Sequence, residues 1–169
     1  MGLDVRITAA IRERRTGRIV SVFDRKTYES DIKFYPELNL EEEDCFRRIE
    51  ICHWRSMHNL FVSLQEIMMN YGLKAGTDKY EFRIAEEAFP EVYEYLLKQA
   101  SLENEEENDD NGWGTPAYQR ANLENALNLL NVMMLPQFFV TENHFLLPED
   151  YQLYQKSPEE YDWEYFLEY

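Results

Sequence analysis

The sequence predicts an α+β protein with a small, largely antiparallel sheet, an N-terminal hairpin and about three packed helices. Three observations indicate this class. Apolar and polar residues alternate over residues 3–7 and 80–84, which is typical of half-buried strands. Elsewhere apolar residues recur every three or four positions, as they do in amphipathic helices. These strand and helix patterns are mixed, without the regular βαβ alternation of a parallel sheet.

The N-terminal strands are expected to form a hairpin. The alternating segment at residues 3–7 is followed by a second apolar run at residues 19–23. Between the two, Gly17 can adopt the positive φ that a tight turn requires. The turn would therefore carry an arginine-rich tip at residues 12–18.

A central helix is predicted from an apolar stripe with three- and four-residue spacing. Asn39, followed by four acidic residues, suits the start of a helix. Gly72 can end the helix as the residue after its last turn. Residues 46–51 fit either a separate helical turn or a short strand. The residues of the stripe are Trp54, Met57, Phe61, Leu64, Met68 and Tyr71.

Two further helices are expected after the strand at residues 80–84. The first begins near Phe89, with Pro90 tolerated in its first turn. The second begins at Thr115-Pro116, and short strands would follow at residues 138–140 and 145–147. The buried face of the second helix is expected to consist of Leu123, Leu127, Leu130 and Met134.

We expect one domain and a C-terminal appendage. Residues 1–156 would form a single α+β domain with an acidic loop at residues 103–112. Residues 157–169 would form an aromatic–acidic C-terminal helix or tail, because Ser157-Pro158 followed by two glutamates is typical of a helix start.

Charge divides the chain unevenly. The formal net charge is −16; residues 1–60 hold 11 Lys/Arg and 11 Asp/Glu, whereas residues 61–169 hold 6 Lys/Arg and 22 Asp/Glu. A strongly anionic body repels nucleic acid and anionic lipid and attracts basic protein surfaces. We therefore expect a basic protein as partner, with no direct nucleic-acid binding and no membrane binding.

A cytoplasmic location is expected. The N-terminus lacks the apolar core of a signal peptide, and no apolar run approaches the roughly 20 residues of a membrane span. Cys45 and Cys52 are the two cysteines, and we expect them to be reduced and buried.

The candidate partner-binding residues are acidic side chains in the loop and the C-terminal segment. They could stand where a nucleic acid has phosphates, with an aromatic anchor beside them. The alternatives are a solvated loop, and aromatic residues packed on the protein's own sheet. The candidates are Glu103, Glu105, Glu106, Glu107, Asp109, Asp110, Glu159, Glu160, Asp162, Trp163 and Glu164.

A second set of candidates is basic. These residues would serve a small anionic ligand or nucleotide in a protein that sequesters or processes a signal. The arginine tip could instead be a solvated hairpin end, or it could pair with acidic regions of a second copy in a homodimer. The set comprises Arg12, Arg14, Arg15, Arg18, Arg55 and His58.

Catalytic motifs are not recognisable. Cys52, His53 and His58 are expected on the central helix, but the two histidines are five residues apart rather than the four typical of metal pairs on helices. The sequence holds no phosphate-binding loop, Gly-rich dinucleotide turn or nucleophile elbow. We therefore expect no metal, no cofactor and no enzymatic activity.

A short resemblance bears on origin. The opening Met1-Gly2-Leu3-Asp4 and the later Trp54-Arg55 pair resemble a group of small phage and mobile-element proteins, which begin Met-Gly-Leu-Asp and carry a Tyr-Trp-Arg-Lys-x-Asn-x-x-His helix motif. His53, His58 and Phe61 depart from that motif, as does Ser56, so no site that depends on the group's histidine is carried over. The resemblance implies a mobile-element origin and no particular activity.

Small acidic mobile-element proteins recur among inhibitors of host defence, including anti-CRISPR proteins that act as DNA mimics. By analogy with that class, we expect an inhibitor in the host cytoplasm that occupies the basic nucleic-acid-binding surface of a defence protein. A CRISPR effector nuclease is the first candidate target.

Overall fold

The chain is an α+β protein, as the sequence predicts. The computed structural model describes residues 4–23, 25–39, 46–55, 58–72, 74–75, 81–101, 116–141 and 148–169. The strands are β1 (Asp4–Glu13), β2 (Val22–Phe23), β3 (Phe46–Arg47), β4 (Ile49–Arg55), β5 (Lys74–Ala75), β6 (Glu81–Ile84) and β7 (Tyr161–Glu168).

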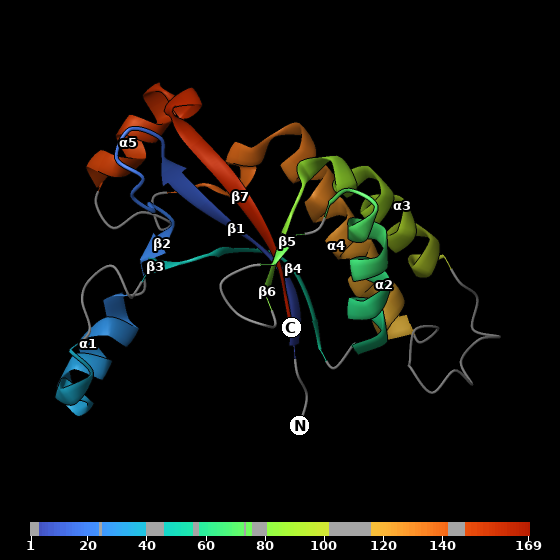
Figure 1. The fold of residues 1–169 in the computed structure, drawn as a ribbon, viewed down its shortest axis with the longest axis horizontal. Helices are drawn as coiled ribbons and strands as arrows, with labels where there is room; N and C mark the ends of the chain where they lie inside the picture. Colours follow the sequence, from blue (N-terminus) through green and yellow to red (C-terminus); the bar gives the residue numbers. More distant parts are fainter. Residues whose placement is uncertain are drawn as a thin grey trace. The chain divides into compact units, whose positions relative to one another are not determined.

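Helices make up most of the remaining described structure (Figure 1). The α-helices are α1 (Arg25–Phe34), α2 (His58–Met69), α3 (Phe89–Ala100), α4 (Pro116–Met134) and α5 (Pro148–Lys156). The 3-10 turns are η1 (Pro36–Leu38), η3 (Glu86–Ala88), η5 (Pro136–Phe139) and η7 (Pro158–Glu160). Among these helices, none is both long enough and apolar enough to cross a membrane.

The strands form two sheets. One has five strands in the order β4-β1-β7-β6-β5, and the other pairs β2 with β3. The β5–β6, β6–β7 and β2–β3 pairs are antiparallel, and β1 and β7 run in opposite directions (Figure 1). The sheet is therefore largely antiparallel, and its central strand comes from the C-terminal segment.

The chain divides into two compact units. Unit 1 comprises Met1–Thr8, Glu50–Phe139 and Tyr165–Tyr169, and unit 2 comprises Ala9–Ile49 and Val140–Glu164. The strands β1 and β7 each contribute residues to both units.

In unit 1, the predicted helix at the centre of the sequence is α2. Phe61, Leu64 and Met68 are buried, as their spacing predicts. Gly72 follows the helix with φ +75°, a left-handed conformation that costs glycine no steric penalty. Trp54 was wrongly placed on this helix, because it lies in β4.

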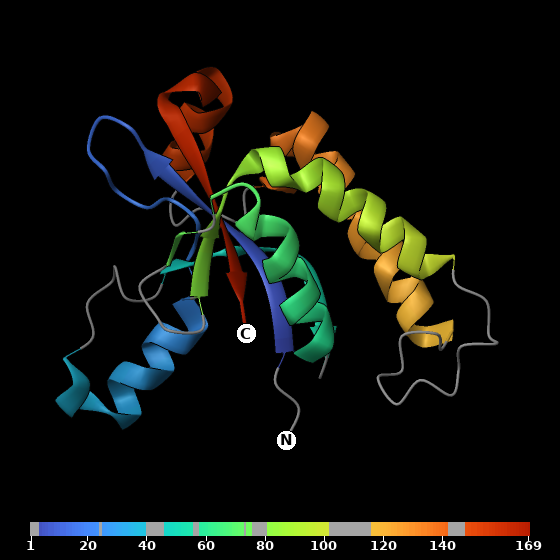
Figure 2. The ribbon, with the colours of Figure 1, turned by 45° about the vertical axis from the view of Figure 1, so that its right-hand side comes forward.

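In unit 1, α3 packs along α4, and α2 also contacts α3 (Figure 2). The predicted strand at residues 80–84 is present as β6, with Tyr80 outside the described residues. Helix α3 begins at Phe89 with Pro90 in its first turn, as predicted. The buried Phe89 ring packs edge-on against Tyr165 of β7, with centroids 4.8 Å apart.

Helix α4 is turned so that asparagines face the sheet. The side chain of Asn125 accepts from the His53 backbone N–H (3.2 Å) and donates to the His53 carbonyl (3.0 Å). The Asn128 amide donates to the Ile51 carbonyl at 3.0 Å, and the Trp54 indole N–H donates to Asn122 Oδ1 at 3.0 Å. Because β4 is an edge strand, these amides satisfy backbone groups that a further strand would otherwise pair.

The predicted buried face of α4 is therefore wrong. Leu123, Leu127 and Met134 are 45%, 47% and 72% exposed, and Leu130 is only partly buried. The helix instead buries Asn122, Asn125, Ala126, Leu129 and Val132. An edge strand needs hydrogen-bond partners more than it needs apolar contact, so the asparagines at three-residue spacing determine how the helix is turned.

In unit 2, the expected hairpin is only partly formed. The Val20 N–H donates to the Ile11 carbonyl at 2.8 Å, and Arg12 and Ile19 form an isolated antiparallel bridge. After this bridge the next strand, β2, pairs with β3 in the two-stranded sheet rather than with β1. Of residues 46–51, which were predicted as a helical turn or a short strand, 46–47 form β3 and 49–51 begin β4, which continues into unit 1.

The C-terminal segment is a strand rather than a helix or tail. Ser157 and Pro158 open only the single 3-10 turn η7, after which β7 runs from Tyr161 to Glu168. The buried Tyr161 packs against the ring of Tyr154, with centroids 5.3 Å apart. Apolar contact between β7 and α5 therefore outweighs the local helix-start signal.

Two other expectations fail locally. Asn39 does not begin a helix; it closes η1 in the left-handed conformation (φ 48°), which asparagine tolerates better than most residues. Phe138 does not belong to a buried strand, because residues 136–139 form η5 and its side chain is 61% exposed. The acidic run at residues 41–44 and the strand expected at 145–147 lie outside the described residues.

Candidate functional site

The arginine-rich tip is a tight turn in unit 2. The Glu13 N–H donates to the Arg18 carbonyl, and the Gly17 N–H donates to the Glu13 carbonyl, both at 2.8 Å. Gly17 has φ +72°, so it supplies the left-handed residue that the turn requires. The turn places Arg14 and Arg15 at its tip and exposes both.

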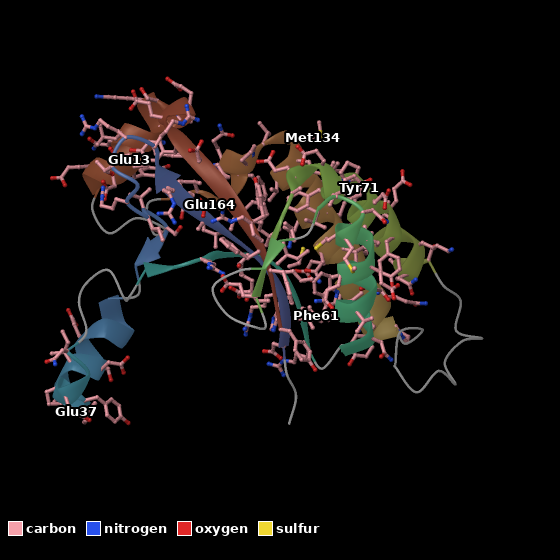
Figure 3. The ribbon with its side chains drawn as sticks, in the orientation of Figure 1. Glu13, Glu37, Phe61, Tyr71, Met134 and Glu164 are labelled. Carbon is pink, nitrogen blue, oxygen red and sulfur yellow. The ribbon has the colours of Figure 1, made fainter. Side chains whose placement is uncertain are left out.

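Arg12 of β1 and Arg14, one residue beyond the end of that strand, pair with two carboxylates of β7. The shortest distances are 2.7 Å from Arg14 Nη2 to Asp162 Oδ1 and 3.2 Å from Arg12 Nε to Glu164 Oε1. Alternate residues of a strand lie on one face, so arginines two apart match acids two apart on the neighbouring strand. Figure 3 labels Glu13, where β1 ends, and Glu164, within β7.

A third arginine pairs with α5. Arg18 Nη2 lies 2.6 Å from Asp150 Oδ1, and the Asp150 side chain is only 9% exposed. This hydrogen bond raises the pKa of Arg18, against a smaller opposing effect of burial. In the same way, the Arg14 hydrogen bond lowers the pKa of Asp162. We call these side chains the arginine–carboxylate network: Arg12, Arg14, Arg18, Asp150, Asp162 and Glu164.

The network brings together residues from both predicted site sets. Asp162 and Glu164 were assigned to partner binding, and the arginines were assigned to an anionic ligand. The arginines of one set therefore neutralise part of the negative charge of the other set, and the reverse also holds. The signal in the sequence was the matching two-residue spacing, which becomes meaningful only once β1 and β7 are known to be neighbours.

A cavity of about 390 Å³ lies beside the tip in unit 2. Arg14 and Arg15 line it together with Glu13 and Glu160, so both charge signs face the same space. The Arg15 side chain is 86% exposed and lies 3.8 Å from Glu13. This mixture makes a weaker anion site than four unpaired arginines would make.

The other predicted residues are distributed as follows. Glu159 and Glu160 are exposed on η7, and the Trp163 indole N–H donates to the Tyr154 hydroxyl at 3.2 Å. Arg55 ends β4 and His58 begins α2, both in unit 1. The six acidic loop candidates lie outside the described residues: Glu103, Glu105, Glu106, Glu107, Asp109 and Asp110.

The expected grouping of Cys52 and His53 with His58 on one helix is wrong, because the first two lie in β4. Burial raises the pKa of the Cys52 thiol well above its ordinary value, with a smaller contribution from the charge of Glu50. A thiol in such a place is a poor nucleophile. His53 Nε2 lies 3.0 Å from Asp4 Oδ2, so it faces a carboxylate rather than the thiol.

Within the described ranges, no three or more His, Cys, Asp or Glu side chains are grouped so as to hold a metal ion. Compared with protein-family models, curated proteins and solved structures, the chain gives no match.

Proposed function

We propose that this chain is an acidic interaction protein of phage or mobile-element origin that inhibits a host nucleic-acid-processing defence protein. It would occupy the basic surface on which that protein binds nucleic acid. A CRISPR effector nuclease is the first target class to test.

The observation that carries the proposal is that three arginines of unit 2 form ion pairs within the unit. Arg12, Arg14 and Arg18 each pair with a carboxylate of the same unit. They are therefore engaged, while the chain keeps a net charge of −16. An excess of carboxylates is offered to a partner, and a basic nucleic-acid channel is the complementary surface.

The mechanism would be competition for the nucleic-acid site. Carboxylates would steer association, and apolar and aromatic contacts would slow release. Glu159 and Glu160 are exposed on η7, and the acidic run at residues 103–110 adds the largest local density of charge in the sequence. Asp162 and Glu164 would serve mainly to hold β1 beside β7.

The test is to mix the protein with Cas9 and its guide RNA, in parallel with other basic nucleases, and to measure co-elution and DNA binding at low and high salt. We expect a complex that excludes DNA and weakens sharply with salt, because exposed charges are screened. Changing the six loop acids to Gln or Asn, together with Glu159→Gln and Glu160→Gln, should abolish exclusion of DNA.

The control is a variant with Glu29→Gln and Glu37→Gln, two exposed acids elsewhere in unit 2. It should inhibit as well as the parent protein. If the loop and η7 variant still excludes DNA, or if no nuclease of the panel binds, the proposal is wrong.

A second candidate function has one specific observation in its favour, the cavity lined by Arg14 and Arg15. It would hold a small anionic ligand such as a nucleotide in a protein that sequesters or processes a signal. Thermal-shift screening with anionic nucleotides tests it, with Arg15→Gln as the variant that should lose the response. A response equal in both proteins would rule out the cavity as the site.

A further inference from the structure

The outward face of α4 in unit 1 is apolar. Leu123, Leu127 and Met134 lie on this face, and along the chain Leu135 (63% exposed) and Phe138 (61% exposed) continue it into η5. We call these five residues the apolar stripe, and Figure 3 labels Met134 where α4 ends. Exposed apolar residues grouped in this way are typical of protein-binding surfaces.

The stripe ends beside a groove of about 300 Å³. Val132 and Pro136 line it, together with the nearly buried rings of Phe89 and Tyr165. Met133, which is 38% exposed, also lines the groove and directly precedes Met134 in the sequence. The groove therefore opens next to the stripe.

Glu86 and Glu87 of η3 give the same groove negative charge. Partial burial raises the pKa of Glu86, and the adjacent charge of Glu87 adds to this effect. Both carboxylates would gain from a cation placed between them. In the sequence, no Lys or Arg stands between Arg83 and Lys98, while Glu91 adds one more exposed acid on α3.

We propose that this groove binds an arginine side chain of a basic partner protein, and that apolar residues flanking that arginine pack on the apolar stripe. The inference rests on the proposed function only in taking the partner to be a basic protein. A guanidinium pairs with carboxylates through directional hydrogen bonds, and the methylene stem of arginine packs on apolar surface. The groove offers both kinds of group, Glu86 and Glu87 for the hydrogen bonds and Pro90, Met133 and Pro136 for the stem.

Charge and extent favour this occupant over others. A second copy of the chain would bring another net charge of −16 to an acidic groove. A small organic cation would fill the groove but leave Leu123 and Leu127 uncovered. A peptide segment that combines arginine with apolar residues matches both the groove and the stripe.

The test uses a short fluorescent peptide of leucine and arginine with an amphipathic helical pattern, in physiological salt. Matched peptides have Gln in place of Arg, or Ser in place of Leu. We expect binding of the Leu–Arg peptide alone, measured by fluorescence anisotropy. Glu86→Gln with Glu87→Gln should weaken that binding about tenfold, the scale on which a charge-assisted hydrogen bond acts.

The matched control carries Glu66→Gln and Glu94→Gln, an equal change of charge at two exposed positions of unit 1. It should change affinity by no more than about twofold. In methyl NMR of the methionines, the peptide should shift Met133 and Met134, whereas Met69 on α2, 67% exposed, should not move.

Equal weakening by both variant pairs would mean that the peptide senses only net charge, and the groove would be rejected. Absence of binding, or shifts at Met69 alone, would also overturn it. Peptide binding that depends on Glu86 and Glu87, with no nuclease bound by the protein, would keep the groove and reject the target class. Nuclease binding without peptide binding would reject the groove and keep the target class.

Discussion

In both units, polar side chains fix β-strands in place, but the kind of side chain differs between the units. In unit 1, neutral and buried asparagines of α4 pair with the edge strand β4; Asn122 and Asn125 are 1% and 5% exposed. In unit 2, charged side chains link β1 and the turn that follows it to β7, and the Arg14 side chain in that turn is 63% exposed.

The two kinds of contact differ in how much folding free energy is lost when the contact is broken. A buried amide that is lost leaves backbone groups without partners and without water. An exposed ion pair that is lost leaves two charges in solvent, which is nearly as favourable. The asparagine contacts should therefore dominate stability, and the arginine contacts should mainly decide which charges remain visible to a partner.

Among the polar contacts, the largest effect is expected for Asn125→Ala. It would leave the N–H and the carbonyl of His53 unpaired beneath α4, at about 1–3 kcal/mol for each buried group. We expect a loss of about 3 kcal/mol in the free energy of unfolding by urea. Asn131→Ala, at a partly buried position of the same helix, should cost far less; equal losses would mean that the amide contacts do not determine the packing of α4.

A smaller loss is expected for Asp150→Asn, the least exposed carboxylate of the arginine–carboxylate network. Arg18 would keep a weaker partner, and because its own side chain is 41% exposed, solvent would stabilise it in part. We expect a loss of about 1–2 kcal/mol. A double-mutant cycle with Arg18→Gln measures the coupling, and a coupling as large as the Asn125 effect would erase the contrast between the units.

Leu127→Gln should change stability by no more than about 0.5 kcal/mol, since the side chain faces outward. Two positions further along α4, Leu129 is fully buried, and Leu129→Ala should cost about 2–5 kcal/mol. Urea unfolding of the two variants checks which face of the helix is inside. A larger loss of stability for Leu127→Gln than for Leu129→Ala would support the buried face that was expected from the leucine spacing.

The smallest effect is expected for Asp162→Asn and depends on pH. The Arg14 hydrogen bond lowers the pKa of Asp162 in the folded protein below its ordinary value of 3.8. Its contribution is thus present above that value and is lost as the pH falls through the lowered pKa. The variant should be slightly less stable than the parent at neutral pH and equally stable in acid, with the difference suppressed by salt.

Sequence patterns predicted elements whose local signals agree with their surroundings. Phe61, Leu64 and Met68 share one face of α2, and Pro90 sits in the first turn of α3. Helix α1 was missed because most of its residues are polar, so its few apolar positions did not stand out in the sequence.

The sequence of the C-terminal segment contains a helix-start signal and a strand-like alternation, and the segment folds as a strand. Ser157 and Pro158 indicated a helix, but Tyr161, Trp163 and Tyr165 alternate with acids at the two-residue period of a strand. Local capping is worth about 1 kcal/mol, whereas burial of each aromatic side chain is worth more. The face of α4 could not be predicted, because nothing in its own sequence reveals that β4 is an edge.

The position of β7 within the sheet has a consequence for the order in which the protein folds. It lies between β1 and β6. Arg12 of β1 and Glu164 of β7, which are paired in the structure, are 152 positions apart in the sequence. Closing so long a loop is slow compared with forming local helices. During synthesis, β1 must wait with one side unpaired until almost the whole described chain has emerged, so the nascent chain is exposed to mispairing and aggregation for most of that time.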